Sequence, residues 1–239
     1  MTLLAIVSVQ LGFAQVATST NYQLQSDSLN FGGGLSTSTN YTQESTFGEI
    51  GTGRASSTNY QLRAGYQQMQ EVYIAISSAA DVTMSPTLGG ITGGTSNGST
   101  SVIVTTDSPS GYSLTIQAEG NPAMQRAGGG SIPNYTGSFP ADFSFNTAGA
   151  SAFGFSPSGV DLVSSYLDDG SDCGVGSLDT PLACWNGIPT SPAQIASGGG
   201  SNHPSGATTT VHFRVGVDSN AGVIAGLYTA TTTLTALPL

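Results

Sequence analysis

The stretch that decides the fold is TVHFRVGVDSNAGVIAGLYTATTTLTA, residues 210–236. Two runs in it alternate apolar or β-favouring side chains with polar or small ones. The apolar sides are Val211, Phe213, Val215 and Val217 in the first run, and Tyr228, Ala230, Thr232, Leu234 and Ala236 in the second. Because side chains alternate across a strand, each run predicts a strand with one face on a core and one face in water. The turn-forming link at 218–222 predicts that the two strands pair antiparallel. Such a pair needs a second sheet over its apolar face, so the stretch predicts an all-β, antiparallel β-sandwich.

The composition narrows the classes of partner. The chain of 239 residues has four basic residues, all arginine, against 14 acidic residues, and its formal net charge is −10. An acidic surface repels nucleic acid and anionic lipid, so we expect neither as a partner. Only 8% of the residues are charged, and a lysine-free, Thr- and Ser-rich β chain is more typical of exported surface proteins than of cytosolic enzymes. Without lysine no Lys–Asn isopeptide bond can form, so any polymer of this chain is expected to be non-covalent.

The amino-terminal residues predict a secretion signal. Residues 3–13 form an apolar run of the length of a signal-peptide core. Gly12 and Ala14 place small side chains where a signal peptidase reads them, so cleavage before Gln15 would remove residues 1–14. The alternative is a buried N-terminal strand, because no basic residue stands near the start of the chain. The run is shorter than the roughly 20 apolar residues of a membrane span, so we expect no membrane insertion after signal removal.

A repeat follows the apolar run. Ser-Thr-Asn-Tyr occurs at Ser19–Tyr22, Ser38–Tyr41 and Ser57–Tyr60, each copy starting 19 residues after the previous one. Each unit of this module, residues 15–70, predicts a short strand from the Tyr, a turn, a second short strand and a Gly-rich turn. Such a unit cannot bury its own apolar side, so its copies should stack or pair. We interpret the module as a small β-meander packed on the main domain. A ligand-presenting array of Asn and Tyr side chains, or a flexible stalk, are the alternatives.

The rest of the chain, residues 71–239, predicts the β-sandwich domain. Alternation at 112–118 predicts a strand, and the turn-forming residues 107–111 precede it. About residues 121–201 predict a long irregular insertion, with a short helical turn near 162–167. Insertions of this length commonly carry binding sites.

Three stretches resemble known proteins. The repeats and the sequence NYQLRAGYQ at 59–67 resemble uncharacterised secreted repeat and β-sandwich proteins of candidate-phyla bacteria. The stretches TTDSPSGYSLTI (105–116) and AGLYTATTTL (225–234) are similar to strands of bacterial surface sandwiches, the nearest comparisons being WxL-like domains and fimbrial or spore-coat-type subunits. The resemblance implies an Ig-like or surface-protein type of sandwich. Trp185 is followed by Asn186 where the WxL motif has leucine, so wall binding is carried over to no residue.

Two groups of residues predict local chemistry in the insertion. Cys173 and Cys184 are the only cysteines, and in an exported chain two cysteines this close predict a disulfide. No further ligands in metal-site spacing accompany them, so no metal site is expected with them. Asp168, Asp169 and Asp172 form an acidic turn whose oxygens are a candidate calcium site, although the spacing is not that of an EF-hand. A solvated turn is the alternative, and we expect no other cofactor.

Trp185, Tyr135 and Tyr166 are candidate rings for stacking on a glycan. Enzymatic activity is not expected, because the two histidines belong to no recognisable catalytic motif. The sequence GFSPSG at 154–159 resembles a nucleophile elbow, but its second glycine comes one residue late.

These features predict a secreted bacterial protein, extracellular or on the cell surface, with a structural or adhesive role. The first hypothesis is a non-covalent filament or coat subunit in which residues 15–24 complete the sheet of a neighbouring copy by strand addition. The alternative is a glycan- or cell-wall-binding module that uses residues 121–201, and an extracellular hydrolase is the remote alternative. The expected partners are therefore copies of the chain itself or glycans and proteins of the cell surface.

Overall fold

The chain divides into two compact units, Met1–Glu71 and Val72–Leu239, which we call the repeat unit and the sandwich unit. The computed structural model describes residues 17–18, 23–24, 32–39, 42–48, 53–56, 61–64, 72–89, 91–137, 140–147 and 149–239. The predicted signal peptide, residues 1–14, lies outside the described residues. The described residues form sixteen strands and no α-helix, so the predicted all-β class is confirmed.

The described strands of the repeat unit form β-hairpins. β1 (Ala17–Thr18) pairs with β2 (Gln23–Leu24), β3 (Gly32–Thr37) with β4 (Thr42–Phe47), and β5 (Gly53–Ser56) with β6 (Gln61–Ala64), all antiparallel. In each hairpin the tetrapeptide Ser-Thr-Asn-Tyr is the segment between the paired strands. The first strands end at 18, 37 and 56 and the second strands begin at 23, 42 and 61, so the hairpins recur with the same 19-residue spacing as the tetrapeptide.

The expected strand after each tetrapeptide is present, because β2, β4 and β6 begin directly after its Tyr. Each of these strands pairs with the strand that precedes the tetrapeptide. Among the described strands, ladders join the two strands of each hairpin, and none joins one hairpin to the next. Leu35 and Phe47 of the hairpin β3–β4 are exposed, at 66% and 74%.

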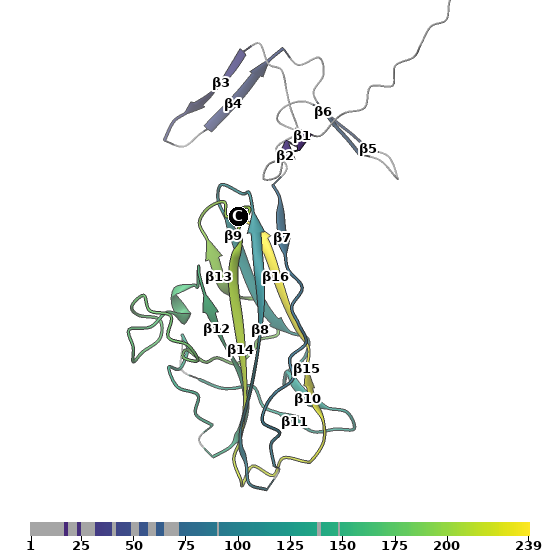
Figure 1. The fold of residues 1–239 in the computed structure, drawn as a ribbon, viewed down its shortest axis with the longest axis vertical. Coiled ribbons are helices and arrows are strands. Elements are labelled where there is room, and N and C mark those ends of the chain that lie inside the picture. The colour runs from purple at the N-terminus through teal and green to yellow at the C-terminus, as the bar shows by residue number, and fades with distance from the viewer. Residues whose placement is uncertain are drawn as a thin grey trace, which may run out of the picture. The chain divides into compact units, whose positions relative to one another are not determined.

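The sandwich unit contains two main antiparallel sheets (Figure 1). The first sheet has the order β12 (Ser151–Gly159), β14 (Ala207–Val217), β8 (Gly94–Thr106) and β7 (Ile74–Ile76). The second sheet has the order β13 (Ala193–Gly198), β9 (Tyr112–Ala118) and β16 (Thr232–Pro238). A small third sheet has the order β11 (Ser131–Ile132), β10 (Met124–Arg126) and β15 (Tyr228–Ala230), and β15 leads directly into β16.

The two runs at 210–236 are both strands, but they do not pair with each other. β14 pairs with β12 on one side and with β8 on the other, along nine and eleven register positions. No edge of β14 is therefore left for β16, which pairs with β9 in the second sheet instead. The predicted antiparallel pair was wrong, because the link after residue 217 crosses from one sheet to the other.

The predicted irregular insertion at 121–201 contains two strands of the main sheets, β12 and β13. In β12 the alternation is hidden, because Phe153 and Phe155 are buried on one face while Gly154 and Ser156 are buried on the other. A strand covered on both faces gives no period-two pattern, so the sequence did not distinguish it from a loop. The expected helical turn is present as the 3₁₀ helix η1 (Ser164–Tyr166).

The core lies between the two main sheets. Its most deeply buried aliphatic and aromatic side chains include Val102, Val104, Tyr112, Leu114, Ile116, Phe155, Ile195 and Val211. Each such side chain contributes roughly 1.5–3 kcal/mol by its removal from water. The turn before β9 requires glycine at Gly111, where φ is +87° and a Cβ would lie 1.8 Å from the carbonyl oxygen of Gly198. Within the described ranges, no helix is long and apolar enough to cross a membrane.

Candidate functional site

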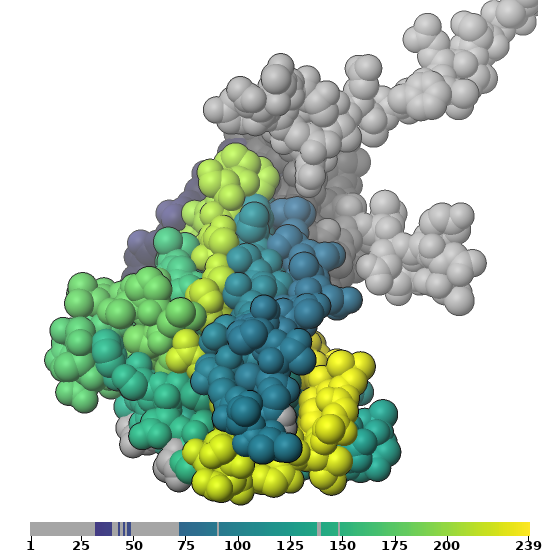
Figure 2. Space-filling model, turned by 60° about the horizontal axis from the view of Figure 1, so that its bottom comes forward, coloured from purple at the N-terminus to yellow at the C-terminus, as the bar shows by residue number. Residues whose placement is uncertain are grey.

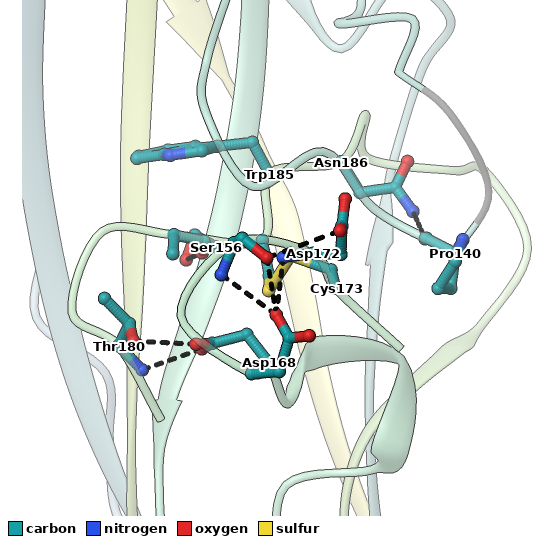
Figure 3. The surroundings of a disulfide bond; sticks show 12 residues. Pro140, Ser156, Asp168, Asp172, Cys173, Thr180, Trp185 and Asn186 are labelled. Carbon is teal, nitrogen blue, oxygen red and sulfur yellow. Dashed lines mark hydrogen bonds between the residues drawn. A yellow bond between two sulfur atoms is a disulfide. The ribbon is translucent and has the colours of Figure 1, made fainter. Parts of the chain in front are cut away.

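The loop between η1 and β13 is closed by the predicted disulfide. Cys173 and Cys184 are bonded, with their Cα atoms 5.6 Å apart, and both side chains are buried (Figure 3). The Ser156 hydroxyl on β12 donates a hydrogen bond to the carbonyl oxygen of Ala183, next to the disulfide. The bonded loop is therefore fixed to the first sheet.

Asp168 organises the start of this loop. Its carboxylate is fully buried and accepts hydrogen bonds from the Gly170 N–H at 2.8 Å, the Thr180 N–H at 3.0 Å and the Thr180 hydroxyl at 2.8 Å (Figure 3). Burial raises the pKa of Asp168, but the hydrogen bonds from Thr180 and Gly170 outweigh it and hold the pKa below its ordinary value. The carboxylate thus links the acidic turn to Thr180, farther along the disulfide-bonded loop.

The calcium candidate at Asp168, Asp169 and Asp172 is contradicted by this geometry. Asp169 accepts hydrogen bonds from the backbone N–H groups of Asp172 and Ser171, at 2.9 and 3.0 Å, which lower its pKa. Both oxygens of Asp168 and the Oδ1 of Asp169 thus accept bonds from donors of the loop itself. Among the described residues no group of three or more His, Cys, Asp or Glu side chains could hold a metal ion.

The three candidate glycan-stacking rings are also contradicted. The exposed fractions of Trp185, Tyr135 and Tyr166 are 0%, 5% and 5%, so none has a free ring face for a sugar. Tyr135 and Trp185 form a small second core with Ala152, and Phe145 packs against it. Tyr166 is buried beside Phe155, and burial raises its pKa to about 12. The rings were predicted to be exposed because they lie in a segment that was expected to be an irregular surface insertion.

Arg214 covers the second core. Its guanidinium carbon lies 4.2 Å from the centroid of the Trp185 ring, and its Nε donates a hydrogen bond to the Asn97 side chain at 2.7 Å. The alternation of apolar and polar side chains along this strand predicts that Arg214 faces water. In the structure, loop residues cover this face of the strand. The cation–π contact stabilises the loop on the sheet by about 0.5–2 kcal/mol.

Ser158 and His212 form the one nucleophile–base pair that the described residues bring together. The Ser158 hydroxyl oxygen is 2.8 Å from the His212 Nε2, between neighbouring strands β12 and β14. Burial lowers the pKa of His212, the charge of Asp179 opposes this shift, and Arg214 adds to it. Asp179 accepts a hydrogen bond from the Gly159 N–H at 2.8 Å. In the described residues no hydrogen bond joins Asp179 to the imidazole, so the orienting role of a catalytic triad is not filled. The stretch 154–159 lies in strand β12, which is not the strand–turn–helix of a nucleophile elbow.

The chain covers both sheet edges on one side of the sandwich. On β12, Phe153 exchanges backbone hydrogen bonds with Pro133 and Tyr135, and Phe155 exchanges them with Asn186. On β13, the Ser197 N–H donates to the Asp161 carbonyl, and the Ile195 carbonyl accepts from Val163. Short bridges of this kind occupy the donors and acceptors that an incoming strand would need.

The outer edge of β15 and β16, on the opposite side, is not covered in this way. The Thr231 carbonyl accepts from Glu119 and the Leu239 N–H donates to Gly111, so odd-numbered residues direct their backbone groups toward β9. The even-numbered residues therefore direct theirs outward, and no backbone hydrogen bond to another described segment occupies them. Their side chains are half-buried, and they are Tyr228, Ala230, Thr232, Leu234 and Ala236.

Apolar side chains of β7 and of the segment between β7 and β8 are also incompletely covered. Ile74, Val82, Met84 and Leu88 pack against the core but are only partly buried. The side with covered edges has fully buried residues instead, such as Ile195 and Ala196. One side of the sandwich is thus closed, and the side of β16 is open. In the sequence, the signal for this edge was the absence of any charged residue after Asp218.

No protein-family model, curated protein or solved structure matches this chain.

Proposed function

We propose that this chain is an exported structural or adhesive protein of a bacterial cell surface, and that its copies assemble non-covalently by strand addition. The observation that carries the proposal is the open edge of β15 and β16, whose outward backbone groups have no partner within the described sandwich unit. An edge of this kind, without lysine or an inward-pointing charge, is a template for another strand.

The exported location is supported by the disulfide and by the composition. A buried disulfide persists in oxidising compartments and is rare in the bacterial cytosol. Fractionation of producing cells tests this part of the proposal: the chain should appear outside the cytoplasm with both cysteines oxidised. Recovery only in the cytosol with free thiols would contradict it.

Assembly is tested by size-exclusion chromatography with light scattering and by negative-stain microscopy. The protein should begin at Gln15, with oxidised cysteines, and be compared over a hundredfold range of concentration. Regular assemblies that grow with concentration are expected. A protein that stays monomeric at every concentration would rule out the structural role.

The sequence predicts the segment 15–24 as the donor of a strand for filament growth, and this donor requires an edge that no other strand occupies. Within it only β1 and β2 are described, and the rest lies outside the described residues. A deletion of residues 15–24 that leaves large assemblies intact would contradict this donor role. The glycan-binding alternative is not advanced, because its three candidate rings are buried.

A further inference from the structure

We propose that residues 228–234 form a two-fold interface, in which the open edge of β15 and β16 pairs antiparallel with the same edge of a second copy. The second sheets of the two copies then join into one continuous sheet. This inference rests on the proposed function, and it names the strand that is added at this edge: the same edge of a second copy, in place of residues 15–24.

Charge favours a second copy as the occupant. Two molecules that each carry a formal net charge of −10 repel each other unless the surfaces that meet are neutral. From Ser219 to Leu239 the chain has no charged residue, so this edge brings no carboxylates together. In Figure 2 the yellow carboxyl-terminal residues lie at the surface, between the blue segment that begins the sandwich unit and teal residues.

The free part of the edge sets the register. β7 lies beside β16 without a hydrogen-bonded ladder between them (Figure 1), and it restricts access to part of β16. With a two-fold axis at Thr231, the whole free part of the edge, residues 228–234, pairs with the same residues of the second copy. This axis pairs Ala230 with Thr232 and Tyr228 with Leu234 of the second copy. All four residues direct their backbone groups outward, so each pair can exchange two hydrogen bonds.

The side chains of this register complement each other. On the exposed face, Thr231 meets Thr231 of the second copy, and Thr229 meets Thr233. Cross-strand threonine pairs are favourable by roughly 0.2–1 kcal/mol each relative to alanine. On the inner face, the half-buried row from Tyr228 to Leu234 gains cover from the same row of the second copy. The interface is therefore isologous and closes as a dimer.

Disulfide trapping tests the register. At a non-hydrogen-bonded position the two Thr231 Cα atoms would lie about 4.5 Å apart, within disulfide range. Thr231→Cys should give a covalent dimer under mild oxidation. Thr235→Cys is the matched control on the same strand and face, because the offset of eight residues puts its counterpart about 27 Å away. Equal cross-linking of both variants, or of neither, would overturn the register.

Sedimentation velocity on the full chain tests the interface without a new thiol. Thr231→Lys places two like charges on the axis and should raise the dimer dissociation constant at least about tenfold. Thr235→Lys makes the same change of net charge away from the axis and should alter the constant less than about threefold. Circular dichroism confirms that both variants are folded. Identical constants for the two variants would refute the two-fold contact.

The outcomes separate this inference from the proposed function. If the wild-type chain forms large assemblies that neither Thr231 variant affects, the two-fold interface is wrong and the structural role stands. If it forms only the cross-linkable dimer, the interface stands and the filament or coat role fails. Deletion of residues 15–24 should leave the dimer unchanged, and loss of the dimer on deletion would show that this segment is the occupant instead.

Discussion

Removal of the Cys173–Cys184 disulfide tests how far the closed loop stabilises the sandwich unit. The two cysteines are separated by 11 residues along the chain. On the chain-entropy model, closing a loop of this length lowers the conformational entropy of the unfolded chain. The folded state is thereby stabilised by about 3 kcal/mol. Both side chains are buried, so replacement by alanine also leaves a small cavity that costs about 1 kcal/mol. The double variant Cys173→Ala, Cys184→Ala should therefore lose about 3–4 kcal/mol of unfolding free energy.

Urea unfolding, followed by tryptophan fluorescence, measures this loss. Trp185 is the single tryptophan, it is fully buried, and it directly follows Cys184, so it reports on the loop and the sheet beneath it. Val175→Ala is the control, because this side chain is exposed in the same loop and its loss should change stability by less than about 0.5 kcal/mol. Reduced wild-type protein keeps both side chains, so it should lose only the loop-closure contribution of about 3 kcal/mol. A loss below about 1 kcal/mol for the double variant would refute the entropic reasoning.

Three further outcomes follow from the site. Thr180→Val removes a hydroxyl donor to Asp168 and should cost about 1.5 kcal/mol in urea unfolding at pH 7. Because the folded pKa of Asp168 lies below its ordinary 3.8, this cost should be present above pH 3.8 and disappear as the pH falls through the folded pKa; a cost that grows in acid would contradict the assignment. Arg214→Met keeps the aliphatic stem but removes the guanidinium, so the free energy of unfolding should fall by about 1 kcal/mol and the tryptophan emission should change. Unchanged emission would show that the stacking is absent. In an NMR titration the pKa of His212 should lie below 6.5, and Asp179→Asn should lower it further, whereas a higher pKa in that variant would argue against their proximity.

The all-β class and the disulfide could be predicted because each depends on local signals. Strands with one wet face, such as β9, show their period in the sequence. Two cysteines without further ligands in metal-site spacing leave a disulfide as the simplest pairing. The 19-residue spacing of the hairpins was also visible, although their phase relative to the tetrapeptide was not.

The candidate site could not be predicted, because its features depend on which segments lie over which strand. Ser156 and Arg214 alternate like solvent-facing residues, yet loop residues cover both. The sequence predicts an exposed ring at Trp185, because nothing in it indicates that this loop folds back onto β12. Which edge of a sheet stays open likewise depends on long-range pairing, here between β12 and the segment around Tyr135.

The coincidence of hairpin and repeat has a genetic consequence. A duplication or loss of nineteen codons, wherever it begins within the repeats, adds or removes one complete hairpin and leaves the reading frame and every later strand unchanged. The number of hairpins ahead of the sandwich unit can therefore change by recombination between neighbouring copies, while the sandwich itself is inherited intact. Related genes should accordingly differ in length by multiples of this unit between the amino terminus and the first strand of the sandwich.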